Sequence, residues 1–285
     1  MSDVGQPPKA MPMQAVSLTW HVDDIELPLE LAVPGPPVEP QAILPALQKL
    51  VNEVVDLSVK VLAGKGKTVS CKAGCGACCR QIVPISDIEA YAIGEVIERM
   101  PEARRAHVMQ RFADAERQLA AIKPLDQIVD GLNGPDRYEF AVAYFKYGVA
   151  CPFLEDESCS IYHDRPLICR EYLVHTPAER CAKVGEGGIG VVPISRTSKA
   201  LFRMTAVQDK PVETRVPLSL VPWWIARHPK NLKLAGGGEW MMRFVRSMEQ
   251  ADIEEVEAWE RAKKRSAAAA EEAASPAGSM VAPST

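Results

Sequence analysis

The chain has 285 residues, an apolar content of 47%, and 33 basic against 37 acidic side chains, which gives a net charge of −4. This length predicts one main domain, and the charge argues against nucleic acid and anionic membranes as partners. The N-terminus lacks the basic start and apolar run of a signal peptide, and no stretch has 18 uninterrupted apolar residues. We therefore expect a soluble, cytoplasmic protein.

The N-terminal segment, residues 1–42, is predicted to contain a hairpin and a proline-rich linker. Apolar and polar residues alternate from 16 to 31 on both sides of Asp23, which is typical of two antiparallel strands. Pro28 in the second stretch favours an edge strand. The sequence VPGPPVEP from Val33 predicts a stiff linker, because prolines can neither continue a helix nor donate hydrogen bonds to a sheet.

Residues 43–265 are predicted to form the main domain, and helical patterns dominate its first half. Apolar residues recur at helical spacing over 43–62. Ser86 and Glu89 form a capping box that starts a second helix, and a third is predicted after Pro101 as far as about residue 122.

The second half of the main domain has weaker patterns. KPLDQIVDGLNGPDRY, residues 123–138, predicts a loop, and residues 189–207 predict two strands around a turn near Arg196. A short helix is expected over 218–227, followed by a C-terminal helix over 239–265 with an apolar stripe. The tail, 266–285, is low in complexity and is predicted to be disordered. The fold class predicted is mainly α with minor β (α+β), in which helices support a loop-rich cysteine-cluster domain.

All eight cysteines lie within residues 71–181, so we place the core of the domain at 69–181. Four of them occur in VSCKAGCGACCR, residues 69–80. In a reducing compartment such clustering favours metal ligands over disulfides, with reactive thiols as the alternative. The candidate metal ligands are Cys71, Cys75, Cys78, Cys79, Cys151, Cys159, Cys169 and Cys181.

The spacing of the first four cysteines limits how they can bind. Cys75 and Cys78 have the C-x2-C spacing that lets two sulfurs converge on one ion, and thiolates favour zinc, Cu(I) or iron–sulfur chemistry. The neighbours Cys78 and Cys79 project about 100° apart on a helix and to opposite faces on a strand. They either serve two centres or a multi-metal cluster, or one is a ligand and the other an apolar filler.

The second group, from Cys151 to Cys181, is predicted to fold back onto the first and complete the coordination. Its His163 and His175 could each replace a cysteine as ligand. Cations near the cysteines in sequence would favour thiolates and offset the charge of the site. They are Lys72, Arg80, Arg165, Arg170 and Arg180.

CKAGCGACC followed by CPFL and CSIYHDRPLICREYLV resembles the bacterial YkgJ-type cysteine-cluster family, the CxxCxxCC proteins, which are described as zinc- or iron-chelating. The chain departs from that pattern by three residues between Cys71 and Cys75. The resemblance implies a loop-rich metal-binding domain in which Arg165 and Tyr172 support the ligands. Some members are flagellin lysine methylases, which implies protein modification as a role but supplies no catalytic residue here.

The sequence favours a non-enzymatic protein that binds zinc or iron, the iron either as an ion or in an iron–sulfur cluster, with a metal ion as its partner. The alternative is an enzyme that uses the centre, such as a methylase-like or redox enzyme. A third interpretation is an interaction module that docks a protein partner through an exposed helix or the Trp223–Trp224 pair, although paired tryptophans more often belong to the core. The C-x3-C-x2-C spacing also occurs in radical S-adenosylmethionine enzymes, but the expected helices do not fit their strand–helix repeats.

Overall fold

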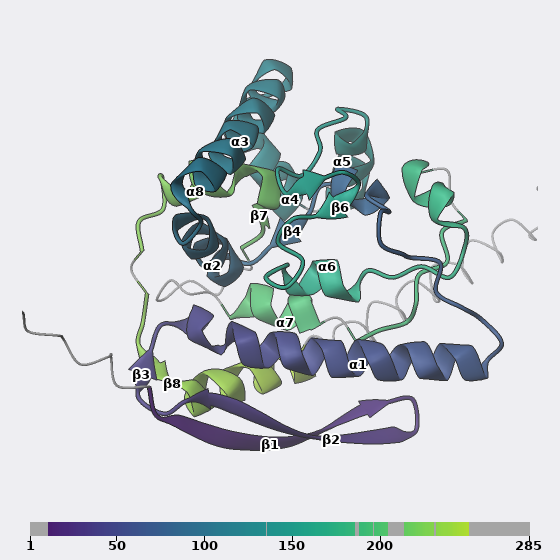
Figure 1. Cartoon of the computed structure of the whole chain (residues 1–285), viewed down its shortest axis with the longest axis vertical. Helices are drawn as coiled ribbons and strands as arrows, with labels where there is room; N and C mark the ends of the chain where they lie inside the picture. The colour runs from purple at the N-terminus through teal and green to yellow at the C-terminus, as the bar shows by residue number, and fades with distance from the viewer. Residues whose placement is uncertain are drawn as a thin grey trace, which may run out of the picture.

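The computed structural model describes residues 11–250 except residues 135, 186–187, 196, 205–213 and 231. As predicted, the described fold is mainly helical with minor β structure. A long hairpin lies against helix α1 (Leu44–Gly64), and the other labelled helices and the cysteine-bearing loops lie on the opposite side of α1 (Figure 1). The cysteines are therefore held on the far side of α1 from the hairpin.

The predicted hairpin is confirmed. Strands β1 (Met13–Val22) and β2 (Ile25–Pro34) pair antiparallel, with Val16 opposite Leu31. Alternate residues of β2, among them Leu31 and Val33, are fully buried, because successive side chains of a strand point to opposite faces. The buried face belongs to the same core as α1.

The proline-rich segment does not act as the linker that we expected. Its short strand β3 (Pro37–Val38) pairs with β8 (Ala235–Gly236), and the 3-10 helix η1 (Pro40–Ile43) leads directly into α1. The indole N–H of Trp240 donates to the carbonyl oxygen of Val38 at 3.0 Å. Prolines are tolerated in so short an edge pairing, and the buried side chain of Val38 ties the segment to the core.

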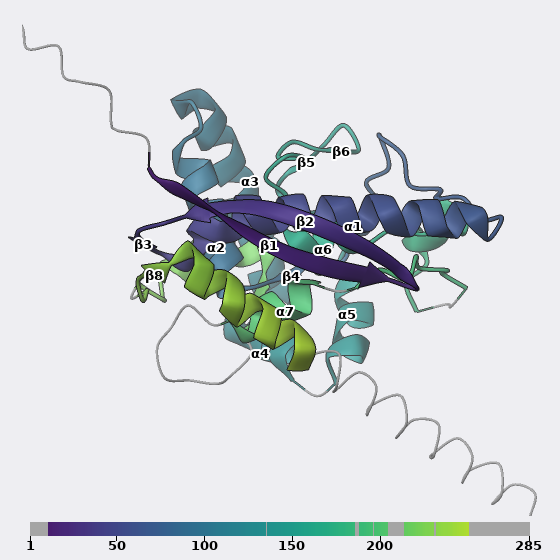
Figure 2. The ribbon, with the colours of Figure 1, turned by 90° about the horizontal axis from the view of Figure 1, so that it is seen from below.

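Helix α1 confirms the helix predicted over 43–62 and buries an apolar stripe that includes Leu47 and Leu50. A helix over residues 237–250 lies beside the hairpin (Figure 2) and buries Met241 and Phe244. The remainder of the predicted C-terminal helix and the tail lie outside the described residues.

Helices α2 (Asp87–Glu98) and α3 (Glu102–Ile122) confirm the next two predictions. The capping box at the start of α2 is complete, because Ser86 and Glu89 exchange hydrogen bonds between side chain and backbone. The short helix expected near 218 is present as η4 (Leu218–Leu220) and α8 (Val221–Ile225). Both tryptophans of α8 are buried, at 8% and 3% exposure, so Trp223 and Trp224 belong to the core, as favoured from the sequence, and do not form a docking surface.

The loop predicted over 123–138 is wrong, because the chain forms α4 (Leu125–Asn133) and begins α5 (Arg137–Phe145) there. Ile128 and Leu132, four residues apart, are the buried residues of α4. A Cβ on Gly131 would lie 2.7 Å from the ring of Phe140 in α5. The glycine therefore lets the two helices pack closely.

The two strands predicted over 189–207 are also wrong. The described part of this stretch contains one isolated bridge, between Val191 and Val174, and the helix α7 (Thr197–Arg203). The carboxylate of Glu171 accepts hydrogen bonds from the hydroxyl of Thr197 and from both the backbone N–H and the hydroxyl of Ser198. It thereby provides an acceptor for a backbone N–H in the first turn of the helix, where the helix itself offers none. A carboxylate from another element thus decides the structure here.

The sheets of the described residues are all two-stranded and antiparallel. Besides the hairpin and β3–β8, they are β4 (Pro84–Ile85) with β7 (Val216–Pro217) and β5 (Leu154–Glu155) with β6 (Ser158–Cys159). Within the described ranges there is no strand–helix repeat of the radical S-adenosylmethionine type.

Candidate metal centre

The first cysteine group lies on a glycine-rich turn that ends in the 3-10 helix η2 (Ala77–Arg80). Gly74 has a φ of 79°, a conformation that favours glycine, and lets the chain turn between Cys71 and Cys75. A Cβ on Gly76 would lie 2.6 Å from the side chain of Leu154. A larger residue at this position would have to displace the side chains of Leu154 and Glu157 in the second cysteine group.

The β5–β6 hairpin brings part of the second group to η2. Its turn residues, Asp156 and Glu157, both have positive φ, and the carboxylate of Glu157 pairs with both terminal nitrogens of Arg80, at 2.9 and 2.5 Å. The backbone N–H of Cys151 donates to the carbonyl oxygen of Cys79 at 2.7 Å. Cys159 pairs with Leu154 in this hairpin, so both cysteines lie on a segment anchored to the doublet.

The end of the second group returns to the start of the first. Ser70 donates its backbone N–H to the carbonyl oxygen of Val174 at 2.9 Å, and the N–H of Val174 lies 3.4 Å from the sulfur of Cys71. The 3-10 helix η3 (Ala178–Ala182), which carries Cys181, contacts η2. The two groups therefore meet, as the sequence predicted.

Helix α6 (Leu167–Glu171) carries Cys169 of the second cysteine group. The buried carboxylate of Glu89 accepts a hydrogen bond of 2.8 Å from the backbone N–H of Leu167, the first residue of this helix. Arg170 is buried and donates to the side chain of Asn52 at 2.9 Å and to the carbonyl oxygens of His163 and Arg165. Arg170 thus supports the loop mechanically instead of facing solvent.

The cysteine doublet forms an unequal pair. Interaction with the neighbouring Cys79 thiol, followed by the nearby charge of Arg165, lowers the pKa of Cys78 to about 7. The same interaction, together with burial, raises the pKa of Cys79. Cys78 is therefore the thiol that loses its proton first.

Several of the other described thiols have a shifted pKa, and in each of them burial favours the neutral form. Burial raises the pKa of Cys151 to about 12, and burial followed by the thiolates of Cys151, Cys78 and Cys159 raises that of Cys169 well above its ordinary value. The same causes, burial first, raise the pKa of Cys71, Cys159 and Cys181. Thiols that raise one another's pKa lie close together, so a bound cation would remove a shared electrostatic penalty.

The donor set fits zinc or iron, which take thiolate ligands. Within the described ranges all eight cysteines are free thiols, and seven of them are only partly exposed while Cys181 is buried. The Nε atom of Arg165 is buried and has no hydrogen-bond partner among the described residues, although its guanidinium lies 3.9 Å over the ring of Tyr162. A metal-bound thiolate would supply the missing acceptor.

No three Cys, His, Asp or Glu side chains of the described residues already surround a common ion position. His163 is exposed and packs edge-on against Tyr162, and the ring of His175 lies against Gly190. The thiols remain the principal candidate ligands.

Sequence reasoning missed the residues that hold the centre from a distance. Asn52 lies on α1, Glu89 on α2 and Ser70 just before the first cysteine, and each bonds to a segment far along the chain. Glu89 did stand out as part of a capping box, but that pattern does not indicate its second bond to α6. Local sequence contains no sign of the other two.

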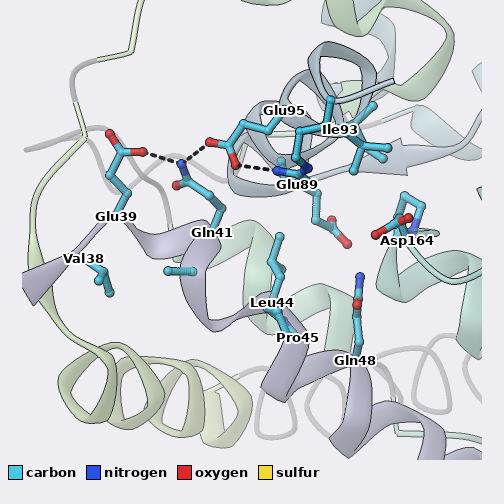
Figure 3. Close-up of a pocket in the computed structure, with 15 residues that line it drawn as sticks. Val38, Glu39, Gln41, Leu44, Pro45, Gln48, Glu89, Ile93, Glu95 and Asp164 are labelled. Atoms are coloured by element: carbon cyan, nitrogen blue, oxygen red, sulfur yellow. Dashed lines mark hydrogen bonds and ion pairs between the residues drawn. The ribbon is translucent and has the colours of Figure 1, made fainter. Parts of the chain in front are cut away.

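Two pockets lie near these residues. The larger, about 420 Å³, is lined by α1, α2 and the loop before α6, and Figure 3 shows Gln48, Glu89 and Asp164 projecting toward the same part of it. None of the described residues that line it is a cysteine. A shallower pocket of about 260 Å³ is lined by Cys151 and by Arg111 of α3. This second pocket therefore lies beside one residue of the second cysteine group.

Comparison with known proteins finds one match. Residues 70–184 match the CxxCxxCC family, which is described as "Putative zinc- or iron-chelating domain". Neither a curated protein nor a solved structure matches the chain. Among the described helices none is long and apolar enough to cross a membrane.

Proposed function

Because residues 70–184 form a CxxCxxCC domain, we propose that this protein binds zinc or iron through its clustered cysteines and uses the metal without catalysing a reaction. In this role the protein stores, senses or passes on metal or electrons. The observation that carries the proposal is the hydrogen bond between Cys151 and Cys79, which joins two cysteine groups that are distant in sequence. This contact places the two groups where they could share a metal ion.

The proposed ligands come from all eight cysteines, since each lies on a segment that is bonded to, or packed on, the doublet region. When bound, the metal would neutralise thiolates that otherwise repel one another. Burial already costs these thiolates solvation, which supports a metal that replaces their protons upon binding. Part of the binding free energy would then stabilise the loops of residues 70–184.

A more specific version of the proposal is that the cysteines hold an iron–sulfur cluster. Such clusters are held by Cys thiolates, often four for each cluster, and their potentials depend on nearby hydrogen bonds. Arg165 has a buried donor with no partner in the described part of the chain, and its charge favours the thiolates of Cys78 and Cys159. We also propose a cytoplasmic location, since eight free thiols persist in a reducing compartment.

Anaerobic purification followed by metal analysis and a visible spectrum tests this function. The proposal predicts near-stoichiometric zinc or iron in the wild-type chain. A coloured protein that contains iron and acid-labile sulfide would support the iron–sulfur form, and colourless zinc protein would exclude it. Protein that remains metal-free after anaerobic reconstitution with each metal would overturn the proposal.

A second candidate function is an enzyme that uses the centre. The shallow pocket at Cys151 favours it, because a catalytic metal needs an open position that a small molecule can reach. Azide added to the iron-loaded protein tests this alternative. A shift in the visible spectrum would support an open position, and an unchanged spectrum at saturating azide would favour a centre closed by thiolates.

A further inference from the structure

We propose that the pocket of about 420 Å³ lined by α1, α2 and the loop before α6 binds a short aliphatic diamine, a small molecule with an amino group at each end. No cysteine is among the described residues that line it, so this site is separate from the candidate metal ligands. Its volume lies within the range of about 300–1,000 Å³ that is typical of small-molecule sites, which combine apolar walls with a few polar groups.

Polar groups mark two ends of this pocket, as Figure 3 shows. At the first end the side-chain amide of Gln41 donates to the carboxylate of Glu95 at 2.8 Å. Gln48, seven residues after Gln41, projects toward the second end together with Glu89 and Asp164. Because an α-helix rises 1.5 Å per residue, the two ends are about 10 Å apart along α1.

The first end has a buried acceptor that the described residues leave unused. Gln41 is 8% exposed, and its amide nitrogen donates to the carboxylates of Glu39 and Glu95. These bonds fix which way the amide faces, and its oxygen is then buried without a hydrogen-bond partner in the described part of the chain. The two carboxylates already bind the ammonium of Lys230, at 2.6 and 2.7 Å. The unused acceptor is therefore the Gln41 oxygen, which the N–H of an amine would satisfy.

The second end has carboxylates without a cation. The buried carboxylate of Glu89 accepts hydrogen bonds from Ser86 and from the backbone N–H of Leu167, and neither donor carries a charge. Neither Glu89 nor Asp164 forms an ion pair with another described residue. Burial raises the pKa of Glu89, as expected for a buried carboxylate that lacks a counterion. An ammonium bound beside Glu89 and Asp164 would supply that counterion.

The wall between the two ends is apolar. Leu44 of α1 and Ile93 of α2 are both buried and lie between the polar groups of the two ends (Figure 3). An aliphatic chain gains from contact with these side chains, whereas a polar chain would lose hydration there. The two amino groups and the methylenes between them thus each meet a matching part of the pocket.

The charge of the lining selects against acids. The described lining residues include four carboxylates but one cationic side chain, that of Arg99. The carboxylates belong to Glu39, Glu89, Glu95 and Asp164. An anionic ligand of the same size would be repelled by them.

Isothermal titration calorimetry of the full chain with diaminobutane, in physiological salt, tests the site. The wild type should bind one diamine. Asp164→Asn should weaken binding about 10-fold or more, the usual effect of losing a hydrogen bond to a charged group. Glu98→Gln neutralises an exposed carboxylate of α2 outside the lining and should bind as the wild type does.

Butanediol has the same chain without the ammonium groups and should bind at least about 10-fold more weakly than diaminobutane. No binding of diaminobutane to the wild type, equal affinity in Asp164→Asn and Glu98→Gln, or equal affinity for the diol would overturn the proposal. None of these outcomes depends on whether the cysteines bind a metal.

Methyl NMR of the isoleucine-labelled wild type keeps the test decisive if a variant fails to fold. Diaminobutane should shift the methyl signals of Ile93, which lines the pocket, and leave those of Ile128, which is buried in α4. Unchanged signals of Ile93 at saturating diamine would place any binding elsewhere and contradict the proposed site.

Discussion

The backbone N–H of Cys151 donates to the carbonyl oxygen of Cys79 at 2.7 Å. This bond joins the second cysteine of the doublet to the first cysteine of the distant group. It lies beside a close approach at Gly76, where any side chain would collide with Leu154. Backbone contacts thus fix how the two cysteine groups meet.

Arg165→Gln should weaken metal binding about 10- to 100-fold, the usual cost of losing a group that supports metal ligands. The interaction with Cys79 contributes most to the low pKa of Cys78, and the charge of Arg165 contributes after it. Without Arg165 the pKa of Cys78 rises, so a metal displaces its proton only at higher pH. Competition titration with a chelating dye, repeated from pH 6 to 8, measures both effects. Arg117→Gln, in an exposed ion pair on α3, is the control and should behave as wild type.

Glu89→Gln should destabilise the fold by about 1–3 kcal/mol, because a carboxylate that accepts on both oxygens is replaced by an amide that accepts on one. Glu89 accepts from the N–H of Leu167 on one oxygen and from Ser86 on the other. Urea unfolding of both proteins measures the difference. Glu98→Gln, exposed on the same helix, serves as the control, and equal losses in the two variants would refute this role of Glu89.

Chelation of the metal should loosen the cysteine loops but leave the hairpin and α1 folded. Residues 70–83 and 151–182 contain little regular structure, whereas β2 and α1 share a buried apolar core. Hydrogen exchange followed by mass spectrometry should therefore show faster exchange in the loops alone after chelator is added to the metal-loaded chain. Unchanged exchange in the loops would mean that the metal does not stabilise them.

Leu31→Ala should cost about 2–5 kcal/mol of stability, the usual range for truncating a buried leucine. Leu31 is fully buried where β2 packs on α1. Thermal unfolding of the metal-loaded chain provides the measurement. Glu30→Ala changes the neighbouring, exposed position of the same strand and should leave the midpoint within a degree or two. A Leu31→Ala variant as stable as this control would show that the hairpin does not contribute to the core.

Periodic and locally capped elements were predictable from sequence. The hairpin around Asp23, the stripe of α1 and the capping box at Ser86 each combine a spacing with a recognisable end. The convergence of the two cysteine groups was predictable from residue chemistry, since clustered thiols imply a shared ligand.

The incorrect predictions concern segments whose local structure depends on residues that are distant in the sequence. The carboxylate of Glu171 accepts from the backbone N–H of Ser198 at the start of α7, and Gly131 of α4 leaves room for the ring of Phe140. Val38 turns a proline-rich stretch into part of the core by pairing with Ala235. Nothing in the flanking residues contains this information, because each partner lies elsewhere in the chain.

The most direct test of the metal centre is X-ray absorption at the metal edge of the anaerobically prepared wild-type chain. If the cysteines bind the metal, we expect a first shell of about four sulfur atoms at about 2.3 Å from each zinc ion, or sulfur ligation of iron at a similar distance. A first shell dominated by nitrogen or oxygen at about 2.0–2.1 Å would contradict it, because the metal would then be bound outside the cysteines.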